Sequence, residues 1–349
     1  MSQPGPQDSF AMHDTAFTAS LRRSVAALRG RAKGSPRALA LRFKRHGVWH
    51  GVSWAQFERL VDDSASLWRG LGLGEGARIR IVGAWSEASL ATAYAGALIG
   101  AEVAVGLEAD GVASDAVLVD SSVDLDALRA LGGAVPRLIV VRNEAGVQAG
   151  DLPGLHLFEG LLAAAAASSN GGPPRAGGSH GTAIVAVGPA SGSHAAIGEL
   201  LAAWPAQGLV LGLPEPFGDV YRDLRELSPT VLFDTAQGHA ALADHLRSRR
   251  PAEASTSGRV LAASLHGRPE GWAAAWLRRR VRRQLGLGRL VSAYTDRAPG
   301  PEVGATLSAI GIRLEHFPAP VPAQPAAAVS PARPSGESGL PARLRGAAS

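Results

Sequence analysis

A repeating order of short apolar runs, each followed by a segment with helical periodicity, is the feature that most constrains this chain. Residues 78–83 are predicted to form a strand, residues 86–100 a helix and residues 102–107 a second strand. Residues 137–141 (Arg-Leu-Ile-Val-Val) form a further apolar run, and the same order resumes at residues 182–187. Strands that alternate with helices build parallel sheets covered by helices, so the pattern predicts an α/β fold of two packed α/β layers.

The segment ahead of this pattern carries more specific local signals. Residues 38–44 alternate apolar and polar side chains and residues 48–52 follow after a glycine, which is typical of a hairpin. Ser53-Trp54-Ala55-Gln56 is a capping-box pattern, which predicts the start of a helix that ends near Gly72. Helical spacing of apolar residues predicts an earlier helix over residues 15–31.

Composition divides the chain into segments. Hydrophobic residues make up 46% of the 349 residues and charged residues 19%, so most of the chain is expected to fold. Residues 168–181 are rich in Gly, Pro and Ser, and we expect a linker there between a first α/β subdomain (15–167) and a second one (182–316). Residues 1–14 are expected to be flexible, and residues 317–349, rich in Pro, Ala and Ser, to be disordered.

Composition also excludes several functions. The chain has no cysteine, which rules out disulfides, thiolate metal sites and cysteine nucleophiles. Its net charge is +5, but the arginines are interspersed with acidic residues and no recognition motif is present, so no nucleic-acid partner is expected. The N-terminus lacks a secretory pattern, and the apolar stretch at residues 90–100 is too short to cross a bilayer. We therefore expect a cytoplasmic protein without a transmembrane segment.

Four segments, in this order, are similar to the AMP-forming long-chain acyl-CoA synthetases of the adenylate-forming superfamily. They are residues 40–57, 70–107, 224–233 and 282–314. The resemblance implies the fold of the N-terminal domain of those enzymes, incomplete and without the C-terminal lid domain. It also implies the family reaction, in which ATP activates a fatty acid to an acyl-adenylate that then forms acyl-CoA. A fatty acid or acyl-CoA is therefore the ligand that the resemblance implies.

The family reaction needs ATP, a magnesium ion, and cations and hydrogen-bond donors arranged around the phosphates. The resemblance places the phosphate loop directly after the strand at residues 182–187, where small residues could wrap an anion with their backbone amides. The candidate cofactor-binding residues in this degenerate loop are Gly188, Ser191, Gly192 and Ser193.

Other parts of the family's machinery are missing from their expected places. The only lysines are Lys33 and Lys44, so none is present for the phosphate loop or the lid, and arginine is not an equivalent substitute. Where the resemblance implies Tyr-Gly-x-Thr-Glu, residues 315–320 are Glu-His-Phe-Pro-Ala-Pro. The sequence therefore predicts an AMP-binding, acyl-CoA synthetase-like protein that is catalytically inactive. It offers no catalytic or metal-binding residues, and ATP and magnesium are implied only by the resemblance.

Two alternatives remain open at this point. A partner protein could complete the ligase by supplying the missing groups. Alternatively, residues 272–290, with Trp272, Trp276 and a run of arginines, could bind the surface of an anionic membrane peripherally. We expect instead that both tryptophans belong to the core, because aromatic residues make up only 5% of the chain.

Overall fold

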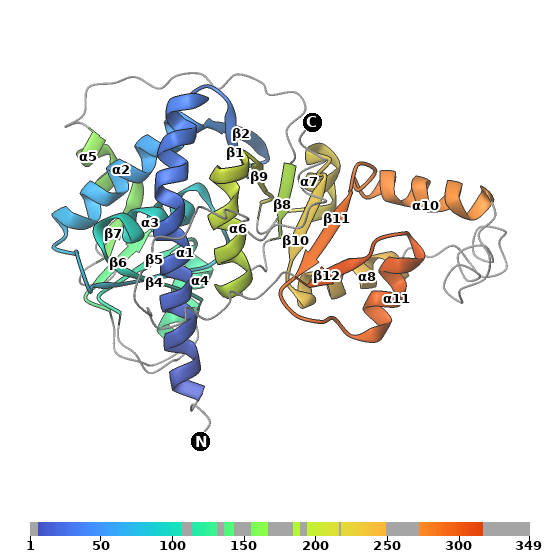
Figure 1. The fold of residues 1–349 in the computed structure, drawn as a ribbon. Coiled ribbons are helices and arrows are strands. Elements are labelled where there is room, and N and C mark those ends of the chain that lie inside the picture. Colours follow the sequence, from blue (N-terminus) through green and yellow to red (C-terminus); the bar gives the residue numbers. More distant parts are fainter. Residues whose placement is uncertain are drawn as a thin grey trace, which may run out of the picture.

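The computed structural model describes residues 6–106, 114–130, 136–142, 155–166, 184–188, 194–215, 218–248 and 272–316. Within these ranges the chain forms two sheets with helices packed between and around them (Figure 1), which confirms the predicted α/β fold. The predicted linker at residues 168–181 and the predicted tail at residues 317–349 lie outside the described residues.

The larger sheet has seven strands, and the N-terminal hairpin forms one edge of it. In spatial order the strands are β12 (Leu314–His316), β11 (Ser292–Thr295), β10 (Val231–Asp234), β8 (Ile184–Val187), β9 (Val210–Leu213), β1 (Leu39–Arg45) and β2 (Val48–Ser53). Among the strands that the structure describes in this sheet, the β1–β2 pairing alone is antiparallel. The hairpin therefore joins a sheet whose other strands all come from the second half of the chain.

The smaller sheet has five parallel strands. They are β4 (Glu102–Val105), β3 (Arg78–Val82), β5 (Ala116–Val119), β6 (Leu138–Val141) and β7 (Leu155–Leu157). The chain adds β4 on one side of β3 and the later strands on the other side, so β3 lies at a topological switch point. Ligand sites of open α/β sheets are found at the carboxyl ends of strands at such points.

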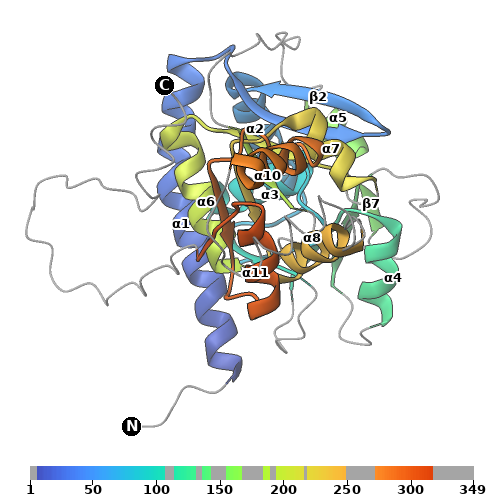
Figure 2. The same cartoon turned by 90° about the vertical axis from the view of Figure 1, so that its right-hand side faces the viewer.

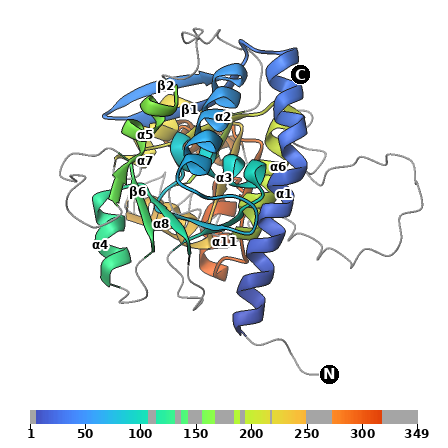
Figure 3. The same ribbon diagram turned by 90° about the vertical axis from the view of Figure 1, so that its left-hand side faces the viewer.

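Helices fill the space between the sheets and cover their outer faces. They are α1 (Pro6–Gly34), α2 (Trp54–Gly70), α3 (Glu87–Ile99), α4 (Ser122–Ala130), α5 (Phe158–Ala166), α6 (His194–Gln207), α7 (Val220–Leu227), α8 (Ala236–Ser248), α10 (Trp272–Gln284) and α11 (Pro301–Ala309). Figures 1 and 2 show the long α1 beside α6, and Figure 1 shows α2, α3 and α5 on the opposite side from α10. Figure 3 shows the side of the molecule on which α2, α3 and α5 lie. The first helix begins at Pro6, before the predicted start at residue 15.

An aromatic cluster joins the two sheets at the centre of the core. The ring of Trp204 lies 5.2 Å from Trp54 and 4.8 Å from Phe57, between centroids. Its indole Nε1 donates to the carbonyl of Ala40 in β1 at 3.1 Å, and Tyr94 Oη donates to the carbonyl of Leu201 at 2.6 Å. All four rings are almost fully buried, so α2, α3 and α6 share one core.

The predicted capping box at the start of α2 is confirmed. Gln56 N donates to Ser53 Oγ at 3.3 Å, and Ser53 N donates to Gln56 Oε1 at 2.8 Å. These two reciprocal bonds satisfy backbone donors that the first helical turn leaves without a helical partner. They also fix the point at which β2 becomes α2.

The expectation that Trp272 and Trp276 belong to the core is wrong. The side chain of Trp272 is 86% exposed and that of Trp276 is 55% exposed. The end of α10 packs against the fold through Val281, and Leu285 directly after the helix is buried in the apolar cluster formed with α7 and α11. The core needs no rings from α10, because tryptophans from α2 and α6 already fill its centre. Among the described helices, none combines the length and apolarity that a membrane span requires.

Candidate functional site

The candidate site lies at the carboxyl edge of the seven-stranded sheet. There Gly188 follows β8, Asp234 is the last residue of β10, and Asp296 follows β11. These three strands are neighbours and run parallel, so the residues at their ends meet at one edge. The edge places backbone amides and two carboxyl groups close together.

Asp234 is nearly buried at this edge. Its carboxyl Oδ1 accepts a hydrogen bond from the backbone N of Thr235 at 2.8 Å. Burial raises the pKa of Asp234 to about 7; the bond from Thr235 opposes this shift, and the charge of Asp296 adds to it. At neutral pH the group therefore exchanges between the acid and the carboxylate.

Two glycines make room for the side chain of Asp234. A β-carbon at Gly188 or at Gly238 would overlap the carboxyl group of Asp234, so only glycine fits at either position without movement. The backbone N of Gly188 donates to the carbonyl of Phe233 at 2.8 Å. The carboxyl group of Asp234 thus fills the space beside Gly188, the first residue of the phosphate loop that the resemblance implies.

Side chains of the protein also accept hydrogen bonds from the backbone donors in the first turn of α8. Ala236 N donates to Asp296 Oδ1 at 2.8 Å, and Gly238 N donates to the hydroxyl of Thr235 at 3.1 Å. Free backbone donors at a helix start form a ready anion site, because the helix dipole adds to them. Here Asp296 occupies the position that an external anion would take.

The structure brings only one of the four predicted cofactor-binding residues to this edge. Gly188 lies there, whereas Ser191, Gly192 and Ser193 lie outside the described residues, and their role stays a prediction. The sequence analysis missed Asp234 and Asp296. Each is an acidic residue at the carboxyl end of a short strand: Asp234 ends Val-Leu-Phe-Asp and Asp296 follows Ser-Ala-Tyr-Thr. That position was the signal that could have found them.

Neither lysine of the chain lies at this edge. Lys33 is exposed in the last turn of α1. Lys44 in β1 is buried, and its Nζ donates to Asp223 Oδ1 and Glu226 Oε2 at 2.6 Å each. Burial lowers the pKa of Lys44, but the hydrogen bonds to Asp223 and Glu226 have the larger combined effect and raise the pKa above its ordinary value. This ammonium group therefore ties β1 to α7.

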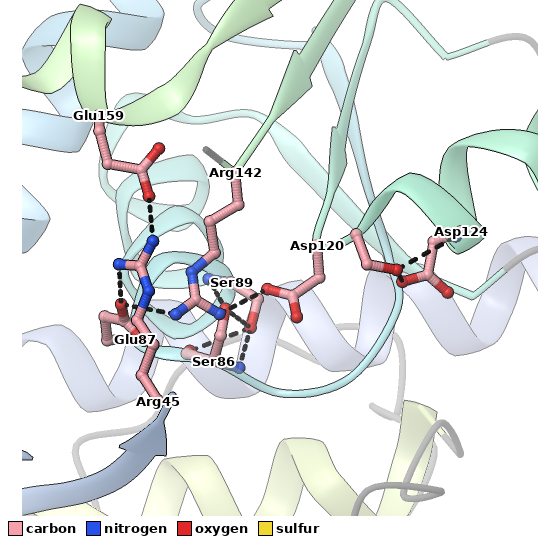
Figure 4. Close-up of polar contacts among 9 residues, drawn as sticks. Arg45, Ser86, Glu87, Ser89, Asp120, Asp124, Arg142 and Glu159 are labelled. Carbon is pink, nitrogen blue, oxygen red and sulfur yellow. Dashed lines mark hydrogen bonds and ion pairs between the residues drawn. The ribbon is translucent and has the colours of Figure 1, made fainter. Parts of the chain in front are cut away.

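A second polar cluster lies at the carboxyl edge of the five-stranded sheet (Figure 4). Arg142 follows β6 and donates to Asp120 Oδ1 at 3.1 Å and to Glu87 Oε1 at 3.0 Å. Burial raises the pKa of Glu87, and the charge of Arg142 opposes this shift. Arg45 of β1 lies 3.5 Å from Glu159 and 4.0 Å from Glu87.

This cluster is a buried ion-pair network that connects the two sheets through Arg45 and Glu87. Because Arg142 already has two carboxylate partners, its charge is matched from within the protein. We therefore assign the cluster a structural role. Among the described residues, no group of three or more acidic or histidine side chains is arranged to hold a metal ion.

No family model matches the sequence, and no curated protein matches it either. Solved structures do match the fold. The adenylation domain of carboxylic acid reductase from Segniliparus rugosus, solved with AMP and a co-purified carboxylic acid, is 15% identical with a TM-score of 0.58, over 83% of this chain and 58% of that one. Acetoacetyl-CoA synthetase from Streptomyces lividans is 14% identical with a TM-score of 0.52, over 86% of this chain and 50% of that one.

Coronafacic acid ligase from Pectobacterium brasiliense gives a similar result, with 12% identity and a TM-score of 0.52, over 84% of this chain and 60% of that one. The chain thus spans between 50% and 60% of the length of these three structures. The similarity shows that the chain has the fold of the N-terminal domain of adenylate-forming enzymes, as the sequence predicts.

Proposed function

We propose that this chain, which has the fold of adenylate-forming enzymes, is an acyl-CoA synthetase-like protein that does not activate carboxylic acids with ATP. The observation that carries the proposal is the position of Asp234 and Asp296. Each carboxyl group takes up a place at the carboxyl edge of the seven-stranded sheet where a phosphate would need a donor or a cation.

Charge explains why this arrangement opposes adenylation. As pyrophosphate leaves, negative charge grows on the phosphates, and catalysis requires preorganised cations and donors around them. Two like charges about 4 Å apart repel by about 4 kcal/mol near a protein surface. A phosphate placed beside Asp296 would meet that repulsion, and Asp234, with a pKa of about 7, would add to it in its ionised form. The buried Lys44 is held elsewhere by Asp223 and Glu226.

We propose that the chain binds a carboxylic acid or its CoA ester without carrying out the ATP-dependent reaction. Support comes from the similar adenylation domain of carboxylic acid reductase, which was solved with AMP and a co-purified carboxylic acid. The apolar chain of such a ligand is bound without phosphate contacts, so this part of the binding can persist where ATP chemistry has been lost.

The test is pyrophosphate release by the full chain with ATP, magnesium and a series of fatty acids. The adenylation domain of the Segniliparus carboxylic acid reductase serves as the active control. We expect no release above that of denatured protein. Release that depends on both the acid and ATP would refute the proposal. Release that appears only after a separate lid domain is added would instead favour a ligase completed by a partner protein.

Calorimetric measurement of ATP affinity tests whether the carboxyl groups of Asp234 and Asp296 keep the nucleotide out. The variant Asp234→Asn/Asp296→Asn should bind ATP with magnesium more tightly than the wild type, because both repulsive charges are removed. Asp244→Asn, on the exposed face of α8, is the matched control and should leave the affinity unchanged. Equal affinities for all three proteins would show that the two carboxyl groups do not exclude the nucleotide.

A further inference from the structure

The exposed tryptophans of α10 lie on a helix with a strong positive charge. The helix carries five arginines and no acidic residue over residues 272–284. Trp272 and Trp276 are one turn apart on the same face, and Arg280 follows a turn later. The guanidinium carbon of Arg280 lies 5.3 Å from the ring centroid of Trp276, within cation–π range.

The two ends of α10 differ in how they meet the fold. Its last turns are anchored by Val281 and by the buried Leu285. Arg282 adds to this anchor, since it donates to the carbonyls of Leu287 and Leu290. The first turns carry the tryptophans away from the sheet, and Figure 1 shows α10 extending outward beyond β11. A firmly held helix therefore presents two large aromatic side chains to the surroundings.

A hollow between α10 and the end of α11 is lined in part by three arginines. It has a volume of about 400 Å³ and lies between Arg278, Arg279 and Arg282 on one side and Gly288, Ile310 and Gly311 on the other. Volumes of this order are typical of small-ligand sites. Guanidinium groups bind phosphate with two parallel hydrogen bonds, which makes a phosphate the fitting occupant. Because Arg282 already donates to two backbone carbonyls, the exposed Arg279 is the arginine of this hollow that would contact the phosphate.

We propose that α10 docks on the surface of an anionic phospholipid bilayer. The charge of the helix is complementary to such a surface, and the arginine-lined hollow receives a lipid phosphate. Tryptophan is favoured at the boundary between headgroups and acyl chains, because its ring is apolar and its N–H is polar. Trp272 and Trp276 would enter that boundary while Arg279, Arg280 and Arg283 remain at headgroup level. Double-stranded DNA would contact the arginines through its phosphates but give no role to two exposed tryptophans, because its bases are stacked inside the duplex.

Sedimentation of the full chain with vesicles tests the proposal. Vesicles of phosphatidylcholine with phosphatidylserine should bind the protein, vesicles of phosphatidylcholine alone should bind it far more weakly, and salt should release it. Trp272→Ala/Trp276→Ala should weaken binding at least about tenfold with an unchanged melting temperature. Arg279→Gln/Arg280→Gln/Arg283→Gln should weaken it by about fivefold for each arginine in contact with the surface.

Arg23→Gln/Arg29→Gln/Arg69→Gln is the matched control, since it removes the same charge from exposed positions on α1 and α2. It should bind vesicles like the wild type. Three results would overturn the proposal: no binding to anionic vesicles at low salt, equal loss in the control and in the α10 arginine variant, or full binding by the double tryptophan variant. Tighter binding to double-stranded DNA than to vesicles would also overturn it, and would assign the surface to nucleic acid.

Discussion

The carboxyl group of Asp234 lies directly against the α-carbon of Gly188, at the point where the chain leaves β8. The two residues come from neighbouring parallel strands and are 46 positions apart, as the β8–β10 pairing requires. The contact lies at the carboxyl edge of the seven-stranded sheet, where we propose that phosphate binding has been lost. Substitutions of either residue can test it.

Replacing Gly188 should show how strongly the close contact with Asp234 affects stability. We expect Gly188→Ala to lower the free energy of unfolding by about 1–3 kcal/mol, because the added methyl group overlaps the carboxyl of Asp234. In the Asp234→Ala background the same change should cost much less. Urea unfolding of the four proteins gives the coupling energy. Gly304→Ala, which meets open space in α11, should be neutral or stabilising, and a coupling near zero would contradict the contact.

The buried carboxyl of Asp234 should make stability depend on pH. Its pKa is about 7 in the fold and near its ordinary value of 3.8 when unfolded, so the folded state holds the proton more tightly. Unfolding between these values releases a proton, and rising pH therefore favours unfolding, by an amount on the order of 4 kcal/mol above pH 7. Asp234→Asn should lose this decline. Parallel pH profiles for the wild type and the variant would contradict the assignment.

The capping box should contribute a modest, local stabilisation. Ser53→Ala removes the acceptor for Gln56 N and is expected to cost about 1 kcal/mol in the free energy of unfolding. Ser66→Ala, in the exposed middle of the same helix, is the control and should be neutral or stabilising. A Ser53→Ala variant as stable as the control would show that the cap has no energetic role.

Breaking the buried ion-pair network should be costly. Arg142→Met leaves the buried Asp120 without its cation and leaves Glu87 with Arg45 at 4.0 Å, and we expect thermal or urea unfolding to show a loss of about 3–5 kcal/mol in the free energy of unfolding. Arg129→Met removes a partner of Asp126 from an exposed pair and should change stability by less than about 1 kcal/mol. Similar effects for the two variants would mean that the Arg142 network is accessible to water.

The tryptophans should divide into two energetic classes. Trp204→Ala empties the centre of the core and is expected to cost about 3–5 kcal/mol. Trp272→Ala, at a side chain that is 86% exposed, should change the free energy of unfolding by no more than about 0.5 kcal/mol. A large loss for Trp272→Ala would show that this ring is covered in solution and would also weaken the proposed membrane contact.

Local signals in the sequence were enough to predict the fold class and several elements. The Ser53–Gln56 capping box and the strand–helix–strand unit from β3 to β4 were predicted from residues that lie close together in the chain. Their hydrogen bonds and apolar periodicity involve near neighbours, so the pattern is complete within a short segment. By contrast, the sequence pattern assigned no element to residues 194–213, where α6 and β9 lie.

Only the tertiary structure decided the features that join distant segments. The pairing of β1 with β9 brings Leu41 beside Leu211. The closure of the candidate site depends on Asp234 and Asp296 meeting amides of other elements. Trp272 is exposed because side chains from other helices and strands already fill the core. Such outcomes depend on the packing of side chains that are far apart in sequence, and no local periodicity encodes that packing.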